Sequence, residues 1–255
     1  MPDVPTTLSI VSGKGGAGKS VVSVNLAESL VAAGATVALV DADFGQSACP
    51  VLLNEQPAAT VQAWADGRGA LEDVLHKTST GVTLVQGAAD PTPGLGPDPV
   101  LYDALDRLLG HLRDTHDFVL LDAPAGLDGP VRWALDRADL GLVVLVGEPT
   151  AVADAYRLVR MMWQADPAFP LGAVVNFTDT EEEARSVHER FGAITERFTG
   201  QTPAWLGWVP FAAQMRRSVA TQTPAARAPG SMQRAFAALA EAVLAGLPSA
   251  EQIGN

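Results

Sequence analysis

One glycine-rich segment constrains the fold of this chain more than any other feature. It matches the pattern G-x-x-x-x-G-K-[ST] and consists of Gly13, Lys14, Gly15, Gly16, Ala17, Gly18, Lys19 and Ser20. Both flanks fit, because Leu8–Val11 predicts a strand before the segment and Lys19–Ala33 predicts a helix after it. Such a loop directs backbone N–H groups at phosphate oxygens, with Lys19 reaching the β- and γ-phosphates and the Ser20 hydroxyl binding Mg²⁺. A glycine-rich turn that binds nothing is the alternative, and the two flanks argue against it.

Short apolar runs alternate with helical patterns along the rest of the chain. The further strands are expected at Thr36–Val40, Val82–Val85, Phe118–Leu121, Leu140–Val146, Gly172–Val175 and Trp205–Val209. The further helices are expected at Pro99–Asp114, Pro130–Arg137, Ala151–Gln164 and Glu181–Phe198, with a last one from Met232. Mostly uninterrupted apolar strands are typical of a sheet buried on both faces. The sequence therefore predicts an α/β fold with a mainly parallel, helix-covered sheet.

The alternation continues through the whole chain and predicts a single domain over residues 1–255. Residues 1–7 and 246–255 are expected to be short tails, and Gly87–Pro99 a surface loop. A second break is expected at Ala225–Gly230, before the last helix.

The composition excludes several classes of protein. The 255 residues include 17 Lys and Arg against 29 Asp and Glu, so the net charge of −12 does not favour coating of nucleic acid. Neither a basic leader nor an uninterrupted apolar stretch of membrane-spanning length occurs, which favours the cytoplasm. Cys49 is the only cysteine, which excludes an internal disulfide and a metal site with two cysteines, and we expect it as a small thiol in or near the core.

Aspartates follow two of the predicted strands. Asp41 and Asp43 come directly after Thr36–Val40, and Asp122 follows Phe118–Leu121. The carboxyl ends of parallel strands are where ligands bind in open α/β sheets, and a strand that ends in Asp is the pattern of a Mg²⁺-orienting carboxylate. By themselves, Asp41 and Asp43 are equally explained as turn-capping residues.

The early lysine of the loop adds a resemblance. K-G-G-x-G-K-S, with Lys14, resembles the deviant Walker A motif of the MinD/ParA ATPases, a family of P-loop NTPases of the SIMIBI class. The resemblance implies ATP hydrolysis with Mg²⁺ and an ATP-dependent homodimer in which Lys14 reaches the partner's nucleotide. It also implies that Asp43 activates the attacking water and that Asp41 and Asp122 hold the magnesium shell. Only three residues are lysines, and two of them are Lys14 and Lys19.

The same resemblance points to residues that contact the base. Relatives use an asparagine and a segment beside a proline at places that correspond to Asn176 and Pro210, which end two predicted strands. Taken alone, either residue is an ordinary turn former.

Within the family, the chain is most similar to the flagellar-number regulators FlhG (also called FleN), from Leu8 to about Leu244. The run Glu148–Tyr156 is the most specific part of this similarity. It implies regulation of flagellar number or placement, or a similar positioning process, with partners such as the FlhF GTPase and flagellar switch components. Two features depart from the pattern: seven residues precede the first strand, and Arg234 is the only basic residue of the last helix. We therefore expect that helix to pack on the sheet, and any membrane association to occur through partners.

The alternative is a partitioning ATPase of the ParA type that binds DNA. It requires a basic surface, for which the candidates are Arg216, Arg217, Arg227 and Arg234. A solvated face or a set of intramolecular ion pairs explains these arginines better at this net charge. A tyrosine kinase and an iron–sulfur protein of the same superfamily are excluded by the two tyrosines and the single cysteine. A nucleotide-gated adaptor, in which hydrolysis only times a complex, remains open.

Overall fold

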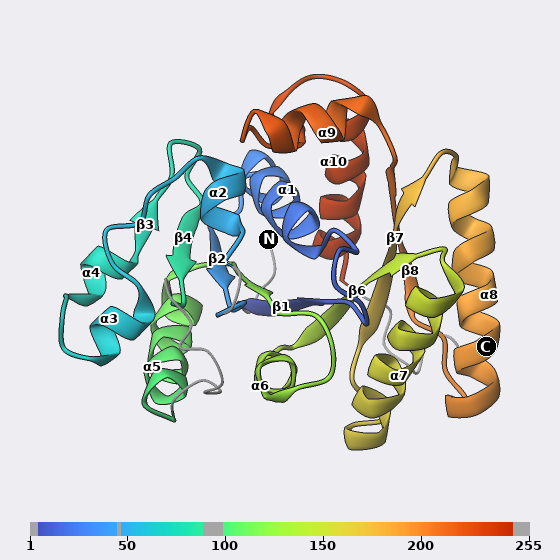
Figure 1. Cartoon of the computed structure of the whole chain (residues 1–255), viewed down its shortest axis with the longest axis horizontal. Coiled ribbons are helices and arrows are strands. Elements are labelled where there is room, and N and C mark those ends of the chain that lie inside the picture. Colours follow the sequence, from blue (N-terminus) through green and yellow to red (C-terminus); the bar gives the residue numbers. More distant parts are fainter. Residues whose placement is uncertain (1–4, 45–46, 89–98, 247–255) are drawn as a thin grey trace.

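The computed structural model describes residues 5–44, 47–88 and 99–246. Most of the expected loop Gly87–Pro99 and nearly all of the expected C-terminal tail lie outside the described residues, as do residues 1–4 of the N-terminal tail. Within them, eight strands form one sheet in the order β3-β4-β2-β5-β1-β6-β7-β8 (Figure 1). Every pair is parallel except the antiparallel pair of β3 and β4. The mainly parallel sheet predicted from the sequence is confirmed.

The elements have the following bounds. The strands are β1 Thr6–Val11, β2 Val37–Asp41, β3 His76–Lys77, β4 Thr83–Gln86, β5 Phe118–Asp122, β6 Leu140–Val146, β7 Leu171–Thr178 and β8 Ala204–Pro210. The helices are α1 Lys19–Ala32, α2 Cys49–Leu53, α3 Val61–Ala65, α4 Leu71–Val74, α5 Pro99–Thr115, α6 Gly129–Asp136, α7 Pro149–Ala165, α8 Glu181–Thr199, α9 Ala213–Ala220 and α10 Ser231–Leu244, with a 3₁₀ turn at Ala225–Arg227.

Alternating side chains of the strands supply two apolar cores, one on each face of the sheet. On β5, Phe118 and Leu120 belong to the core under α1 and α10, whereas Val119 and Leu121 belong to the core under α5 to α8. Figure 1 shows α1, α9 and α10 on one side of the sheet and α5, α6 and α7 on the other. All four side chains are at most 1% exposed, so the sheet is covered on both faces as predicted.

The predicted strands and helices all form, with ends that differ by at most three residues. The sequence patterns missed α2, α3, α4, β3 and α9, which are two to eight residues long. The last helix packs on the sheet as expected, because Phe236, Leu239 and Val243 of α10 are buried. Among the described residues, no helix is both long enough and apolar enough to cross a membrane.

The segment after α9 is tied to α1 by polar contacts. The Asn25 side-chain oxygen accepts from the N–H of Ala226 at 2.8 Å, and Glu28 accepts two hydrogen bonds from the Arg227 guanidinium at 2.7 and 3.0 Å. Glu28 keeps only 5% of its side chain exposed. Arg227, one candidate for a basic surface, is therefore engaged in an intramolecular ion pair.

Candidate nucleotide and metal site

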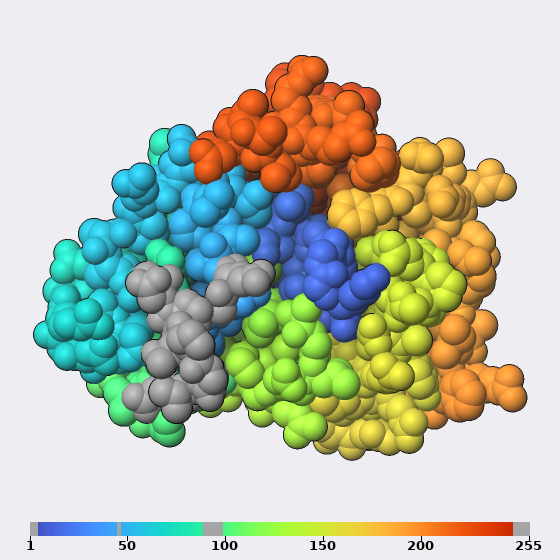
Figure 2. All heavy atoms as spheres, in the orientation of Figure 1, coloured from blue at the N-terminus to red at the C-terminus, as the bar shows by residue number. Residues whose placement is uncertain are grey.

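The glycine-rich loop joins β1 to α1 at the carboxyl edge of the sheet. Gly18 precedes α1 in a left-handed conformation (φ 89°), and no side chain caps the helix there. The first N–H groups of α1 are therefore not satisfied by a capping side chain, which is the arrangement that binds anions at helix N-termini. Figure 2 shows this blue N-terminal segment reaching the surface, with the orange C-terminal part above it.

Two glycines of the loop are required by close contacts. A Cβ at Gly13 would lie 2.2 Å from the backbone N of Ala155 in α7. A Cβ at Gly18 would lie 2.3 Å from Nδ2 of Asn176, in addition to the positive φ. The loop is thus packed directly against α7 and the end of β7, and neither position tolerates a side chain without a shift.

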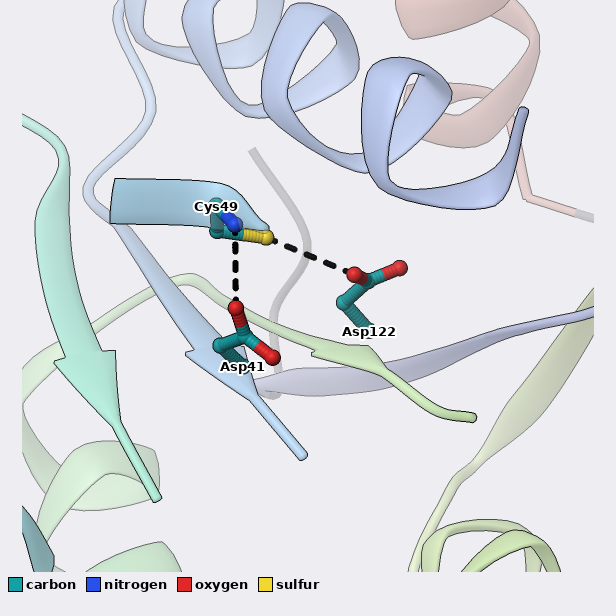
Figure 3. Close-up of side chains that lie close together, drawn as sticks. All are labelled: Asp41, Cys49 and Asp122. Carbon is teal, nitrogen blue, oxygen red and sulfur yellow. Dashed lines mark hydrogen bonds between the residues drawn. The ribbon is translucent and has the colours of Figure 1, made fainter. Parts of the chain in front are cut away.

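The pairing register brings Asp41 and Asp122 together. Asp41 of β2 lies opposite Asp122 of β5, and Asp122 lies opposite Ile10 of β1, just before the loop. Both carboxylates are 1% exposed. Oδ1 of Asp122 accepts from the Ser23 hydroxyl at 2.7 Å, and Oδ2 accepts from Cys49 Sγ at 3.4 Å (Figure 3). Two buried acidic groups therefore face one region beside the N-terminus of α1.

Asp41 is surrounded by donors from the segment that follows β2. Its Oδ2 accepts from the Cys49 N–H at 2.9 Å and from the Ser47 hydroxyl at 2.8 Å, and its Oδ1 accepts from the Asp43 N–H at 3.2 Å. Burial and then the charge of Asp122 raise the pKa of Asp41 to about 7, although these hydrogen bonds oppose the rise. Backbone and hydroxyl donors hold the carboxylate in position, and within the described part of the chain it forms no salt bridge.

Asp122 is perturbed in the same direction. Burial raises the pKa of Asp122, against hydrogen bonds from Ser20 and Ser23 and the positive charge of Lys19. Burial lowers the pKa of Lys19, which is 8% exposed, while the charges of Asp122 and Asp43 oppose that shift. The site thus brings together four predicted residues (Lys19, Ser20, Asp41 and Asp122), with Asp43 beside them.

Lys14 lies apart from this buried group. Its side chain is 46% exposed, and its Nζ forms an ion pair with Oε2 of Glu148 at 2.9 Å. The hydrogen bond and charge of Glu148 raise the pKa of Lys14. Glu148 immediately precedes α7 and belongs to the run Glu148–Tyr156. In this single chain the early lysine is therefore held by a carboxylate of its own protomer.

Asn176 and Pro210 lie at the ends of β7 and β8, where the sequence places them. Asn176 is 3% exposed; its Nδ2 donates to the carbonyl of Ala17 at 2.8 Å and its Oδ1 accepts from the N–H of Phe177 at 3.0 Å. Both residues line a cavity of about 410 Å³, together with Phe177, Phe211 and Met215. The rings of Phe177 and Phe211 meet edge to face, with centroids 6.0 Å apart. An apolar pocket with one amide thus adjoins the loop.

Sequence reasoning missed several residues of this site. Ser23 lies one helical turn beyond Lys19 on α1, so its spacing could have indicated it. Glu148 lies between the end of β6 and the start of α7, a position that also offered a signal. Phe211 belongs to the segment beside Pro210 to which the resemblance points. Cys49 offered no signal, because its approach depends on how α2 folds back.

Comparison with known proteins agrees with this geometry. Residues 3–244 match the ParA family, described as "NUBPL iron-transfer P-loop NTPase". The chain belongs to the ParA/MinD family of P-loop ATPases. The antiactivator FleN of Pseudomonas aeruginosa is 30% identical over 215 residues, which are 84% of this chain and 77% of FleN. The flagellum site-determining protein YlxH of Helicobacter pylori is 26% identical over 74% of this chain and 64% of YlxH.

A solved structure of the ParA/MinD family has the same fold. The septum site-determining protein MinD of Pyrococcus horikoshii, complexed with Mg-ADP, superposes with a TM-score of 0.74 at 26% identity, over 95% of this chain and 98% of that one. The similarity to FleN and YlxH agrees with the resemblance found in the sequence. As a ParA/MinD protein, the chain is an ATPase whose relatives act in spatial positioning.

Proposed function

We propose that this chain is an ATP-driven switch that dimerises on Mg-ATP and positions flagella, or sets their number, through partner proteins. The observation that carries the proposal is the convergence of an uncapped helix N-terminus, a buried lysine and two buried carboxylates at one sheet edge. These groups fit a nucleotide triphosphate with a divalent cation, since the N–H groups and Lys19 meet anionic oxygens and the carboxylates meet the cation.

Each residue has a proposed role. The loop from Gly13 to Ser20 binds the phosphates, with Lys19 at the β- and γ-oxygens. Ser20, Asp41 and Asp122 hold Mg²⁺, directly or through its water. Bound there, the ion neutralises charge that develops on the phosphate oxygens. Asp43 orients and deprotonates the attacking water, and Asn176 and Pro210 contact adenine in the pocket beside the loop.

Lys14 is proposed to act in the partner subunit. Its exposure and its place at the rim of the loop support this, because a lysine that crosses an interface must start from the surface. Dimerisation then requires Lys14 to leave Glu148 for a phosphate, an exchange of one anionic partner for another. Hydrolysis removes the phosphate and allows the pair with Glu148 to form again.

Nucleotide binding and oligomeric state together test this function. Lys19→Ala is expected to abolish ATP binding, measured by calorimetry. Asp43→Ala is expected to bind ATP and to persist as a dimer in size-exclusion chromatography with light scattering. Lys14→Ala is expected to bind ATP but to stay monomeric, while Lys77→Ala, at the exposed lysine of β3, dimerises like the wild type. An Asp43→Ala protein that binds Mg-ATP and remains monomeric would refute the sandwich mechanism.

The flagellar role rests on the similarity to FleN and YlxH. A deletion strain with abnormal flagellar number, restored by the wild type but not by Lys19→Ala, would support it. Two of the arginines that the DNA-partitioning alternative requires have partners within the chain: Arg227 binds Glu28, and Arg216 lies over the ring of Phe211. ATP-dependent binding to non-specific duplex at low salt would nevertheless favour partitioning over flagellar regulation.

A further inference from the structure

The thiol of Cys49 is a buried group beside Asp41 and Asp122 to which the proposed function gives no task. Its Sγ lies 3.4 Å from Oδ2 of Asp122, and its N–H donates to Asp41 from the first turn of α2. The sulfur and one carboxylate oxygen of each aspartate all lie within 4.8 Å of one another. Figure 3 shows the three side chains gathered at this point. All three residues are at most 1% exposed. A sulfur atom, which favours soft metal ions, thus lies beside two carboxylates, which favour hard ones.

The separation between Cys49 and Asp122 agrees with two ligands of one metal ion, and Asp41 completes a group of three ligand atoms within 4.8 Å of one another. Zinc binds carboxylate oxygen at about 2.0–2.2 Å and thiolate sulfur at about 2.3 Å, so an oxygen and a sulfur on one tetrahedral ion lie roughly 3.5 Å apart. The observed separation is 3.4 Å. A second observation points to a cation independently of the sulfur, namely the two buried carboxylates that lie opposite each other in the strand register. Like charges in such a place are stabilised by a positive ion between them.

The presence of sulfur changes which ion the site prefers. Carboxylate, hydroxyl and water ligands suit Mg²⁺, whereas a thiolate selects softer ions. We propose that Asp41, Asp122 and Cys49 form a mixed oxygen–sulfur site that takes a thiophilic divalent cation, such as Zn²⁺ or Cd²⁺, in the nucleotide-free protein. Occupation by such an ion excludes Mg-nucleotide, because Asp41 and Asp122 serve both. The exclusion of Mg-nucleotide rests on the proposed function, in which Asp41 and Asp122 hold Mg²⁺. The proposal of the oxygen–sulfur site does not depend on it.

The binding step is a ligand exchange without electron transfer. The S–H bond of Cys49 breaks and its proton passes to solvent, a metal–sulfur bond forms, and the two carboxylates replace water on the ion. Two carboxylates and a thiolate then surround a dication.

Cadmium titration of the full chain without nucleotide tests the site directly. A cadmium thiolate absorbs in the ultraviolet by charge transfer, and because the chain has one cysteine, the absorption reports Cys49 alone. We expect saturation at one Cd²⁺ per chain. Cys49→Ala and Cys49→Ser are expected to lose the band and to bind Cd²⁺ at least roughly tenfold more weakly. Removing a residue that only hydrogen-bonds to a metal ligand already lowers metal affinity about tenfold, and Cys49 is itself a ligand. Asp122→Asn is expected to keep the band but to require more Cd²⁺.

Two results would overturn the proposal. One is a folded wild-type protein with no thiolate band at saturating Cd²⁺. The other is an unchanged Cd²⁺ affinity in both Asp41→Asn and Asp122→Asn, which would mean that Cys49 binds the ion alone. Lys19→Ala separates this inference from the proposed function, because it is expected to lose ATP binding and still to give the cadmium band. Binding of Mg-ADP to the Cd²⁺-loaded wild type with the thiolate band retained would refute the exclusion of nucleotide.

Discussion

Replacing Asp122 by Asn is expected to stabilise the nucleotide-free protein at pH 8. The pKa of Asp41 rises from 3.8 to about 7 in the folded state. A rise of that size corresponds to about 4 kcal/mol, at about 1.4 kcal/mol per pH unit. Burial is the larger cause and the charge of Asp122 the second, so we assign about 1–2 kcal/mol to Asp122. The Asn amide oxygen still accepts from Ser23, which limits the loss of hydrogen bonding.

The pH dependence has a definite sign. Between pH 4 and 7 the folded state holds more protons on Asp41 than the unfolded state does, so raising the pH favours unfolding. The stabilisation from this group is complete below pH 4 and is lost as the pH rises through about 7. Asp122→Asn lowers the folded-state pKa of Asp41, so the variant loses less stability over this range than the wild type.

Urea unfolding at pH 5, 6, 7 and 8, with EDTA and without nucleotide, measures the effect. The comparison of variant with wild type cancels the contribution of His116 and His188 to the pH dependence. Burial lowers the pKa of both histidines, so their contribution to stability rises with pH, opposite to that of Asp41. Asp103→Asn, which neutralises an exposed carboxylate of α5, is the control and leaves the pH profile unchanged. If Asp122→Asn is no more stable than the wild type at pH 8 and follows the same pH profile, Asp41 and Asp122 do not repel each other in the folded protein.

Three further predictions concern contacts outside the carboxylate pair. Gly13→Ala is expected to destabilise the protein by about 3 kcal/mol in urea unfolding, because the new Cβ would meet the backbone of α7. The control is Gly110→Ala, which lies on the exposed face of α5 with open space around it and is expected to stabilise by about 0.5–1 kcal/mol. Glu148→Gln is expected to lower the ATP concentration needed for dimerisation, measured by analytical ultracentrifugation, because the substitution frees Lys14. The control Glu181→Gln, which removes an exposed ion pair of α8, is expected to leave that concentration unchanged. Arg227→Ala is expected to destabilise the protein by about 3 kcal/mol in urea unfolding, because Glu28 is left buried without its cation. Adding Glu28→Gln is expected to recover part of this loss. Equal stability of the single and double variants would show that the loss does not come from the unpaired charge of Glu28.

The parts of the site that lie at strand ends could be predicted from the sequence. Asp41, Asp122 and Asn176 each follow an apolar run, and parallel strands bring their carboxyl ends to one edge, so local pattern and topology suffice. The loop was predictable for the same reason, since its flanks are a strand and a helix.

The remaining contacts depend on long-range folding. Lys14 and Glu148 are 134 positions apart, and no local pattern links them. Cys49 reaches Asp122 because α2, a helix of five residues, is held against β2 and β5 by the donors around Asp41. A helix that short does not form from its own propensity, so tertiary contacts determine both its existence and its place. The antiparallel β3, with two residues, was missed for the same reason.

The proposed contact of Asn176 with adenine would connect the phosphate loop to the choice of base. One of its two N–H groups is used by the Ala17 carbonyl, and one lone pair of Oδ1 is used by the Phe177 N–H. One donor and one acceptor therefore remain. The edge of adenine offers the complementary pair, an N6 amino donor beside the N7 acceptor, whereas guanine offers two acceptors at O6 and N7. We propose that the hydrogen bond from Asn176 to the Ala17 carbonyl, which fixes the amide against the loop, also leaves the amide matched to adenine, so that the protein binds ATP more tightly than GTP.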